Sequence, residues 1–251
     1  MSEHFTIDTI PVEVRRSRRR KTRIGLAFDP AGRVSLEAPL DATTEELTSV
    51  ITEHGRWLKY RLAAVQAEAA CVGTPTYAEG ELLQYLGEAY ELAVVSGSAG
   101  VKREEREPQL RLFQDVRGIV GRITVSVPNS DPMHVKRVLK GWYLDEARGA
   151  VTRSLERLVH LPWLGTWSGH WRVRYMRSQW GSCSVSGRIA LNAHLVKVPE
   201  RLIDYVVLHE LCHLEHHDHS RKFYGLMRVH MPDWESRRAA LDTYLPLLLD
   251  E

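Results

Sequence analysis

Hydrophobic and polar residues alternate along much of the first 127 residues, which is typical of β-strands with one buried face. Strands are predicted at residues 10–14, 24–28, 34–38, 82–86, 90–95, 110–113 and 119–127. Asp29-Pro30-Ala31-Gly32 predicts a hairpin turn between the second and third of these segments. The polar, charged run 97–108 predicts an exposed loop. A capping box at Thr43-Thr44-Glu45-Glu46 predicts one helix, which should continue to about residue 70.

After Val127 the apolar spacing changes to that of helices. Asn129-Ser130-Asp131-Pro132 is typical of a helix start, and apolar residues then recur at helical spacing to Leu158. Two strands, 171–175 and 188–192, flank a turn. Helices are then predicted at about 199–216, at 220–230 and at 233–247. We therefore predict an α+β protein with a β-rich N-terminal domain that contains one helix (residues 1–128), followed by a C-terminal domain (residues 129–251).

Composition limits the class of protein without naming a partner. The chain has 251 residues, 43% of them hydrophobic and 26% charged, with a net charge of +2, which is ordinary for a globular protein. No apolar run approaches the roughly 18 residues of a membrane span, and the N-terminus has no signal-peptide pattern. Three dispersed cysteines favour a reducing compartment. We expect a cytoplasmic protein with no membrane contact.

The most informative string is His209-Glu210-Leu211-Cys212-His213, which lies within the apolar run Leu202–Leu214. Imidazoles four residues apart lie on one face of a helix, so both can reach one metal ion at about 2.0–2.1 Å. Glu210, between them, can take a proton from a water molecule at that ion. This is the chemistry of zinc-dependent hydrolysis, and we expect Zn2+ at His209 and His213 with Glu210 as the catalytic base. The alternative is a buried helix with two core histidines, whose ring nitrogens would need other partners.

A catalytic zinc ion usually has three protein ligands and one open position. We expect His219 to be the third ligand, because a chain that leaves the helix after about residue 217 can fold back toward the ion. His216 lies seven residues after His209, an advance of about 10.5 Å along a helix, so both could not reach one ion. Glu235, on a later helix, is the next choice, and Asp218 is more typical of a turn.

A second donor to the reacting carbonyl oxygen is usually needed in such a site, and Arg177, Tyr224 and His194 are candidates. The segment 180–184 has two interpretations. It could lie beside the cleft, with a strand edge that binds an extended peptide. It could equally be a glycine turn in a hairpin, with Trp180 packed in the core.

The segment from Arg15 to Arg23 carries seven positive charges in nine residues, namely Arg15, Arg16, Arg18, Arg19, Arg20, Lys21 and Arg23. One interpretation is a nucleic-acid or phosphate contact. The other is a solvated strand and turn whose charge neighbouring acids offset, because the whole chain is nearly neutral and no aromatic residues are interleaved.

Several long motifs together resemble the YgjP-like metallopeptidase-domain family, which is similar to the SprT-like and WLM zinc peptidases. The matching segments are 16–22, 85–87, 176–184, 187–192, 204–213 and 219–224. The resemblance covers most of the chain. It implies that His209, His213 and His219 bind zinc and that Glu210 is the catalytic base. It also implies a zincin-like metallopeptidase domain, with the H-E-x-x-H helix in the active site, after the β-rich region.

Three functions stay open at this point. The first expectation is a zinc-dependent metallohydrolase, specifically a metallopeptidase that cleaves a peptide or protein substrate. The second is a nucleotide or phosphoanhydride hydrolase that uses the same metal site and the arginine-rich run. The third is a non-enzymatic, nucleic-acid-associated protein with a structural zinc.

Overall fold

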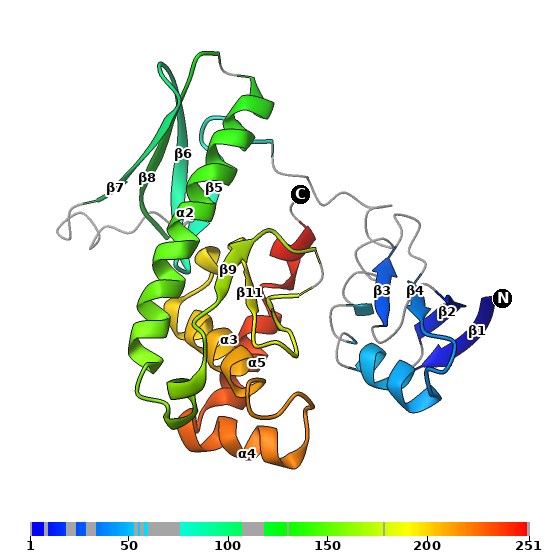
Figure 1. The fold of residues 1–251 in the computed structure, drawn as a ribbon. Helices are drawn as coiled ribbons and strands as arrows, with labels where there is room; N and C mark the ends of the chain where they lie inside the picture. Colours follow the sequence, from blue (N-terminus) through cyan, green and yellow to red (C-terminus); the bar gives the residue numbers. More distant parts are fainter. Residues whose placement is uncertain are drawn as a thin grey trace. The chain divides into compact units, whose positions relative to one another are not determined.

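The protein is a mixture of helices and sheets that divides into two compact units, Met1–Thr74 and Pro75–Glu251 (Figure 1). The computed structural model describes residues 2–7, 10–18, 24–28, 34–52, 55, 58–59, 76–106, 118–129, 131–177 and 179–249. The predicted strand at 110–113 and the continuation of the first helix to about residue 70 lie outside the described residues. Each unit is considered separately below.

The first unit contains a four-stranded sheet of order β1-β2-β4-β3. Its strands are β1 (Ser2–Ile7), β2 (Ile10–Arg16), β3 (Gly25–Phe28) and β4 (Val34–Ala38). The central β2 and β4 are parallel, whereas β3 pairs with β4 in the antiparallel sense that the predicted hairpin requires. The predicted capping box is confirmed, because Thr43 N donates to Glu46 Oε2 (2.8 Å) and Glu46 N donates to Thr43 Oγ1 (3.2 Å).

The second unit begins with another four-stranded sheet, of order β5-β6-β8-β7. Its strands are β5 (Leu82–Tyr85), β6 (Glu88–Ser96), β7 (Gly100–Glu105) and β8 (Ile119–Val127). Alternate residues of β8 are buried, which places its apolar side on the core.

The exposed loop predicted at 97–108 is wrong for residues 100–105, because β7 occupies this part of the polar run. Among the described strands β7 pairs with β8 alone and forms the edge of the sheet, where charged side chains reach solvent. Lys102–Glu104 and Arg103–Glu105 form ion pairs along this exposed strand. Position at an edge, rather than apolar alternation, is what allows this sequence to be a strand.

The long helix α2 (Pro132–Leu158) joins the two halves of the second unit. Asp131 caps it by accepting from Met133 N (3.0 Å), so the helix begins where the sequence predicts a helix start. Its first half runs along the sheet and its second half lies beside α3, described below (Figure 1). Buried residues of β8, α2 and α3 belong to one hydrophobic core. The boundary expected near residue 128 therefore lies inside the second unit, where a sheet-forming segment gives way to a helix that packs against it.

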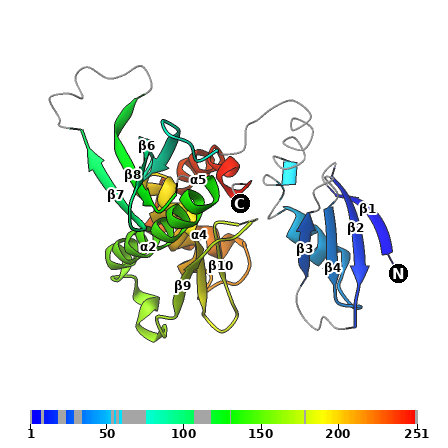
Figure 2. The same ribbon diagram turned by 90° about the horizontal axis from the view of Figure 1, so that it is seen from above.

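The rest of the second unit builds a small sheet and a helical layer around α3 (Glu200–Cys212) (Figure 2). The sheet has the order β10-β11-β9, with strands β9 (Trp171–Arg174), β10 (Gly181–Cys183) and β11 (Ile189–Asn192). The helices are η2 (Pro162–Thr166), η3 (Ala193–Lys197), α4 (Arg221–His230), α5 (Trp234–Asp242) and η4 (Leu245–Leu249).

Two predicted helix ends are wrong. α3 ends at Cys212 rather than near 216, because the chain tightens into turns in which Leu214 N donates to Leu211 O (3.1 Å) and Glu215 N to Cys212 O (3.1 Å). α5 ends at Asp242 rather than 247, and the short η4 follows. Within the described part of the chain, no helix has the length and apolar character needed to cross a bilayer.

Candidate metal centre

Three imidazoles converge at the C-terminal end of α3. His209 lies in its last turn, His213 caps it, and His219 approaches after the chain has turned back. One nitrogen from each ring lies within 4.8 Å of the others. Nε2 of His209 and Nε2 of His219 are 3.1 Å apart. Two ligands of a tetrahedral zinc ion, with bonds of about 2.0–2.1 Å, would be about 3.3–3.4 Å apart. The spacing of the donor atoms therefore fits one small divalent ion.

A hydrogen bond fixes the orientation of the His213 ring. Its Nδ1 lies 3.0 Å from the backbone carbonyl oxygen of His216. The carbonyl can only accept, so Nδ1 carries the proton and Nε2 keeps its lone pair for a metal. His216, one of the rival ligands, thus acts through its backbone rather than its ring.

The ring of Phe223 supports all three imidazoles from beneath. It comes from α4, is fully buried, and its centroid lies 4.9, 4.7 and 4.8 Å from the rings of His209, His213 and His219 respectively. Phe223 falls within the family motif at 219–224, but no role for it was predicted from the sequence. Its place in the first turn of the helix predicted after Ser220, close in sequence to His219, was the available signal.

The histidine cluster favours uncharged rings. Burial lowers the pKa of His209 well below its usual value, and the neighbouring His213 and His219 lower it further by repelling a second positive charge. Neutral imidazole is the form that binds a metal ion. The donor set is thus ready for a divalent cation at neutral pH.

Glu210 lies on the side of α3 that faces β10. It is 5% exposed, and Gly181 of β10 packs directly against its carboxylate. A Cβ built on Gly181 would lie 2.7 Å from Cγ and 2.8 Å from Cδ of Glu210. Burial and the negative charge of Glu210 also raise the pKa of Cys183 to about 11, so this nearby thiol stays protonated at neutral pH.

Asn192, a fully buried residue at the end of β11, positions β10 and the segment before it. Its side-chain amide donates to the carbonyl oxygens of Met176 (2.8 Å) and Gln179 (2.9 Å), and its backbone N donates to Trp180 O (2.8 Å). These bonds hold the chain that leads into Gly181 against the sheet. Sequence reasoning did not single out Asn192, although a polar residue at the end of an apolar strand is a recognisable signal.

A family model described as YgjP-like, metallopeptidase domain, matches residues 22–244. The chain belongs to this family. No curated protein and no solved structure matches the chain significantly. Metallopeptidases are metal-dependent hydrolases of peptide bonds, so membership implies a divalent metal ion and a peptide substrate. Among the described residues of this YgjP-like protein, His209, His213 and His219 form the group whose ligand atoms lie close enough together to hold a metal ion.

The rival ligands lie elsewhere or face solvent. The side chain of Glu235 is 66% exposed and pairs with Arg228 (3.2 Å). Asp218 is exposed, and a hydrogen bond from the Ser220 side chain lowers its pKa. Of these acidic rivals and His219, the structure brings His219 to the other two imidazoles.

The three candidate oxyanion donors are in different places. Tyr224 lies near the cluster, with its ring stacked 6.1 Å from that of His219 and 4.9 Å from that of Trp234. His194 is buried in η3 and lines a separate cavity, and the side chain of Arg177 is exposed. Tyr224 is therefore the candidate that adjoins the three imidazoles.

The basic run is described only in part, because residues 19–23 lie outside the described residues. Arg15 pairs with Glu13 (2.9 Å), and Arg16 pairs with Glu3 (3.3 Å) while donating to Ala42 O (2.8 Å). Both arginines thus have acidic neighbours in the same sheet, as the solvated-strand interpretation expects. A nucleic-acid or phosphate contact through Arg15–Arg23 stays a prediction.

Proposed function

We propose that this YgjP-like protein is a zinc-dependent metallopeptidase in which His209, His213 and His219 bind the ion and Glu210 is the general base. The supporting observation is the convergence of three imidazole nitrogens within 4.8 Å, next to a buried glutamate on the same helix. Imidazole donors suit zinc among the divalent ions. Within the described residues, this group includes no fourth His, Cys, Asp or Glu, which favours a catalytic over a structural site.

The chemistry at the centre divides between the ion and the protein. When bound, zinc supplies a Lewis acid that polarises the scissile carbonyl and makes a water molecule more acidic. Glu210 takes the proton from the attacking water and passes it to the leaving amine. The carboxylate is held for this task by α3 on one side and by Gly181 on the other.

β10 is the element of the chain best suited to orient a peptide. It is an edge strand of the sheet β10-β11-β9, and it pairs with β11 through Gly181, Ser182 and Cys183. An extended peptide can add to an edge strand through backbone hydrogen bonds. Because Gly181 touches Glu210, a peptide bound along β10 would pass beside the general base.

The decisive experiment compares peptide and casein cleavage by zinc-loaded wild-type protein and the Glu210→Gln variant. Loss of the general base lowers kcat by roughly 10²–10⁴-fold. The variant should retain zinc, because its three imidazoles are unchanged. Glu215→Gln removes the same charge from an exposed residue and is the matched control. It should keep wild-type activity.

The wild-type protein and the Glu210→Gln variant also test the two alternative functions, a phosphoanhydride hydrolase and a nucleic-acid-associated protein with a structural zinc. Phosphate release from nucleotides that disappears in Glu210→Gln, without peptide cleavage by the wild type, would replace the peptidase by a phosphoanhydride hydrolase. DNA binding that is unchanged in Glu210→Gln, with no turnover of any substrate, would indicate a structural zinc instead.

A further inference from the structure

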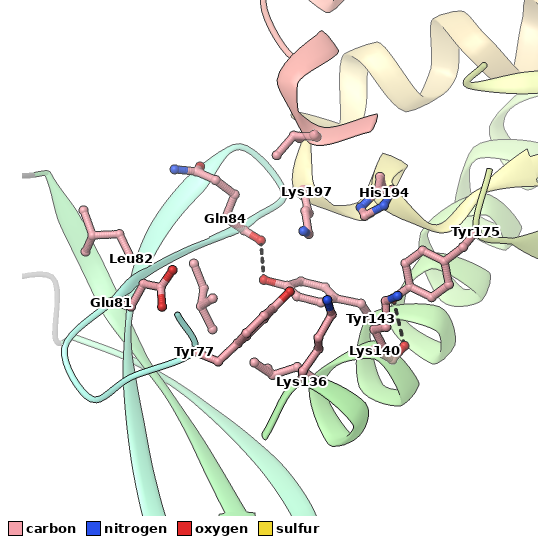
Figure 3. Close-up of a pocket in the computed structure, with 13 residues that line it drawn as sticks. Tyr77, Glu81, Leu82, Gln84, Lys136, Lys140, Tyr143, Tyr175, His194 and Lys197 are labelled. Carbon is pink, nitrogen blue, oxygen red and sulfur yellow. Dashed lines mark hydrogen bonds between the residues drawn. The ribbon is translucent and has the colours of Figure 1, made fainter. Parts of the chain in front are cut away.

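A cationic, aromatic-walled cavity lies in the second unit, apart from the metal centre. Its volume is about 130 Å³, and its lining includes Lys136, Lys140, Lys197, Tyr77, Tyr143 and Tyr175. Figure 3 shows these side chains gathered between β5, α2 and η3. The lining includes none of the three imidazoles of the candidate metal centre.

Each lysine in the cavity lies over the face of one of the tyrosine rings. Nζ of Lys197 is 5.0 Å from the ring centroid of Tyr143, Nζ of Lys140 is 5.1 Å from that of Tyr175, and Nζ of Lys136 is 5.6 Å from that of Tyr77. Cation–π contacts of this kind hold an ammonium group in place without neutralising its charge. Within the described part of the chain, Lys136 and Lys140 form no ion pair.

The charge balance of the cavity is positive. Glu81 is the one acid among the described residues that line it, against three lysines. Its carboxylate accepts from Thr76 Oγ1 (3.0 Å) and from the backbone N of Thr76 (3.3 Å) and Ala78 (3.2 Å). These bonds engage the Glu81 carboxylate with residues 76–78. Lys136 and Lys140, which form no ion pair within the described part of the chain, lie four residues apart on α2, so their like charges repel one another. A bound anion would relieve that repulsion.

The walls of the cavity are held in fixed positions. Tyr143 Oη donates to Gln84 O (2.8 Å) and Tyr175 Oη donates to Lys140 O (2.9 Å), so each phenol is held by a backbone carbonyl group (Figure 3). Tyr77 has a φ of 54°, a left-handed conformation that a bulky residue rarely adopts. Strained residues of this kind persist where the surroundings impose them, often at binding sites. The Glu81 bonds to both neighbours of Tyr77 impose it here.

We propose that this cavity binds a small oxyanion, through the ammonium groups of Lys136, Lys140 and Lys197. One water position needs about 10–15 Å³ of such volume, so the cavity holds roughly ten water-sized positions, enough for a phosphate or a small carboxylate. Lysine binds such groups as a compact charge with several N–H donors. The phosphoryl and carboxylate groups share this chemistry, and the experiment separates them.

The test is isothermal titration of the zinc-loaded full chain with inorganic phosphate and, separately, with succinate. Chloride is adjusted to keep the ionic strength constant, because surface charges would otherwise respond to salt alone. The variants are Lys136→Gln and Lys140→Gln, both on α2 and partly exposed, so glutamine preserves the helix. Lys102→Gln removes the same charge from the exposed edge strand β7 and is the matched control.

We expect saturable binding of at least one probe, with one site per chain. A charge-assisted hydrogen bond corresponds to roughly 10–100-fold in affinity, so each α2 variant should weaken binding by about that factor. Lys102→Gln should bind as the wild type does. The relative affinities of phosphate and succinate identify the preferred group.

Two results would overturn the proposal. In the first, neither phosphate nor succinate binds, which would mean that the lysines serve only to cover the tyrosine rings. Alternatively, both α2 variants bind phosphate as tightly as the wild type, which would place the anion at the zinc ion or another surface. Neither result bears on peptide cleavage, so the proposed function is tested separately.

Discussion

Replacing Gly181 by alanine should remove most of the peptidase activity while leaving zinc bound. Gly181 is not among the residues with positive φ, so its backbone accepts a side chain. The obstacle is the carboxylate of Glu210, whose Cγ and Cδ would lie 2.7 and 2.8 Å from the new methyl group. Carbon atoms in favourable contact are about 3.5–4.0 Å apart. One of the two elements must therefore move by about 1 Å.

The expected effect on catalysis is larger than the effect on stability. Misplacing a catalytic group by about 1 Å costs roughly 100-fold in rate. Forcing an extra methyl group into a packed site costs about 1–3 kcal/mol of unfolding free energy. The three atoms nearest to the new methyl group all belong to Glu210 and none to a histidine, so the variant should bind zinc as the wild type does.

The assay measures kcat/KM for a fluorogenic peptide, zinc content by mass spectrometry and the melting temperature on the same preparations. Gly141→Ala in α2 is the matched control, because its Cβ would meet nothing within 4 Å. Alanine at that helical position should stabilise the protein by about 0.5–1 kcal/mol without affecting activity. Wild-type activity in Gly181→Ala, or loss of zinc together with activity, would refute the proposed contact between β10 and the general base.

Three further predictions concern other contacts of the second unit. Phe223→Ala removes the ring beneath the three imidazoles, so we expect a loss of about 3–5 kcal/mol in urea denaturation and weaker zinc binding in chelator competition; unchanged zinc affinity would contradict a supporting role. Asn192→Asp leaves the carbonyls of Met176 and Gln179 without their donor, at about 1–3 kcal/mol for each group, which denaturation also measures. Burial, and then the hydrogen bond to Glu146, raise the pKa of Tyr85 from 10.0 to about 12. Because the folded protein holds the phenol proton of Tyr85 more tightly than the unfolded chain does, this group stabilises the fold fully below pH 10 and loses that effect as the pH rises toward 12. The unfolding free energy should therefore fall less steeply over this range in Tyr85→Phe than in wild type.

Local sequence patterns were sufficient for elements whose determinants are neighbours in the chain. The capping box at Thr43 forms the bonds that its spacing predicts, and α2 begins within the predicted helix start 129–132, because the partners in each case lie within three residues. The polar run that forms β7 was correctly predicted to be exposed but wrongly predicted to be a loop, because its pairing with β8 at the edge of the sheet is a tertiary contact. The helix end at Cys212 was also missed, since the turns that end α3 lead the chain back toward His219.

At the candidate metal centre, too, some features follow from local sequence and others from tertiary packing. That His209 and His213 share one face of a helix, with Glu210 beside them, follows from helical periodicity, which is a property of a few consecutive residues. The sequence favoured His219 over Glu235 as the third ligand, and the tertiary structure brings His219 to the other two rings. Only the tertiary structure shows that Gly181 packs against Glu210 and that Phe223 lies under the rings. These contacts join separate elements, so they depend on how α3, α4 and β10 pack around a common core. No repeat or spacing along the chain encodes that packing, because it is the outcome of burying many apolar side chains at once.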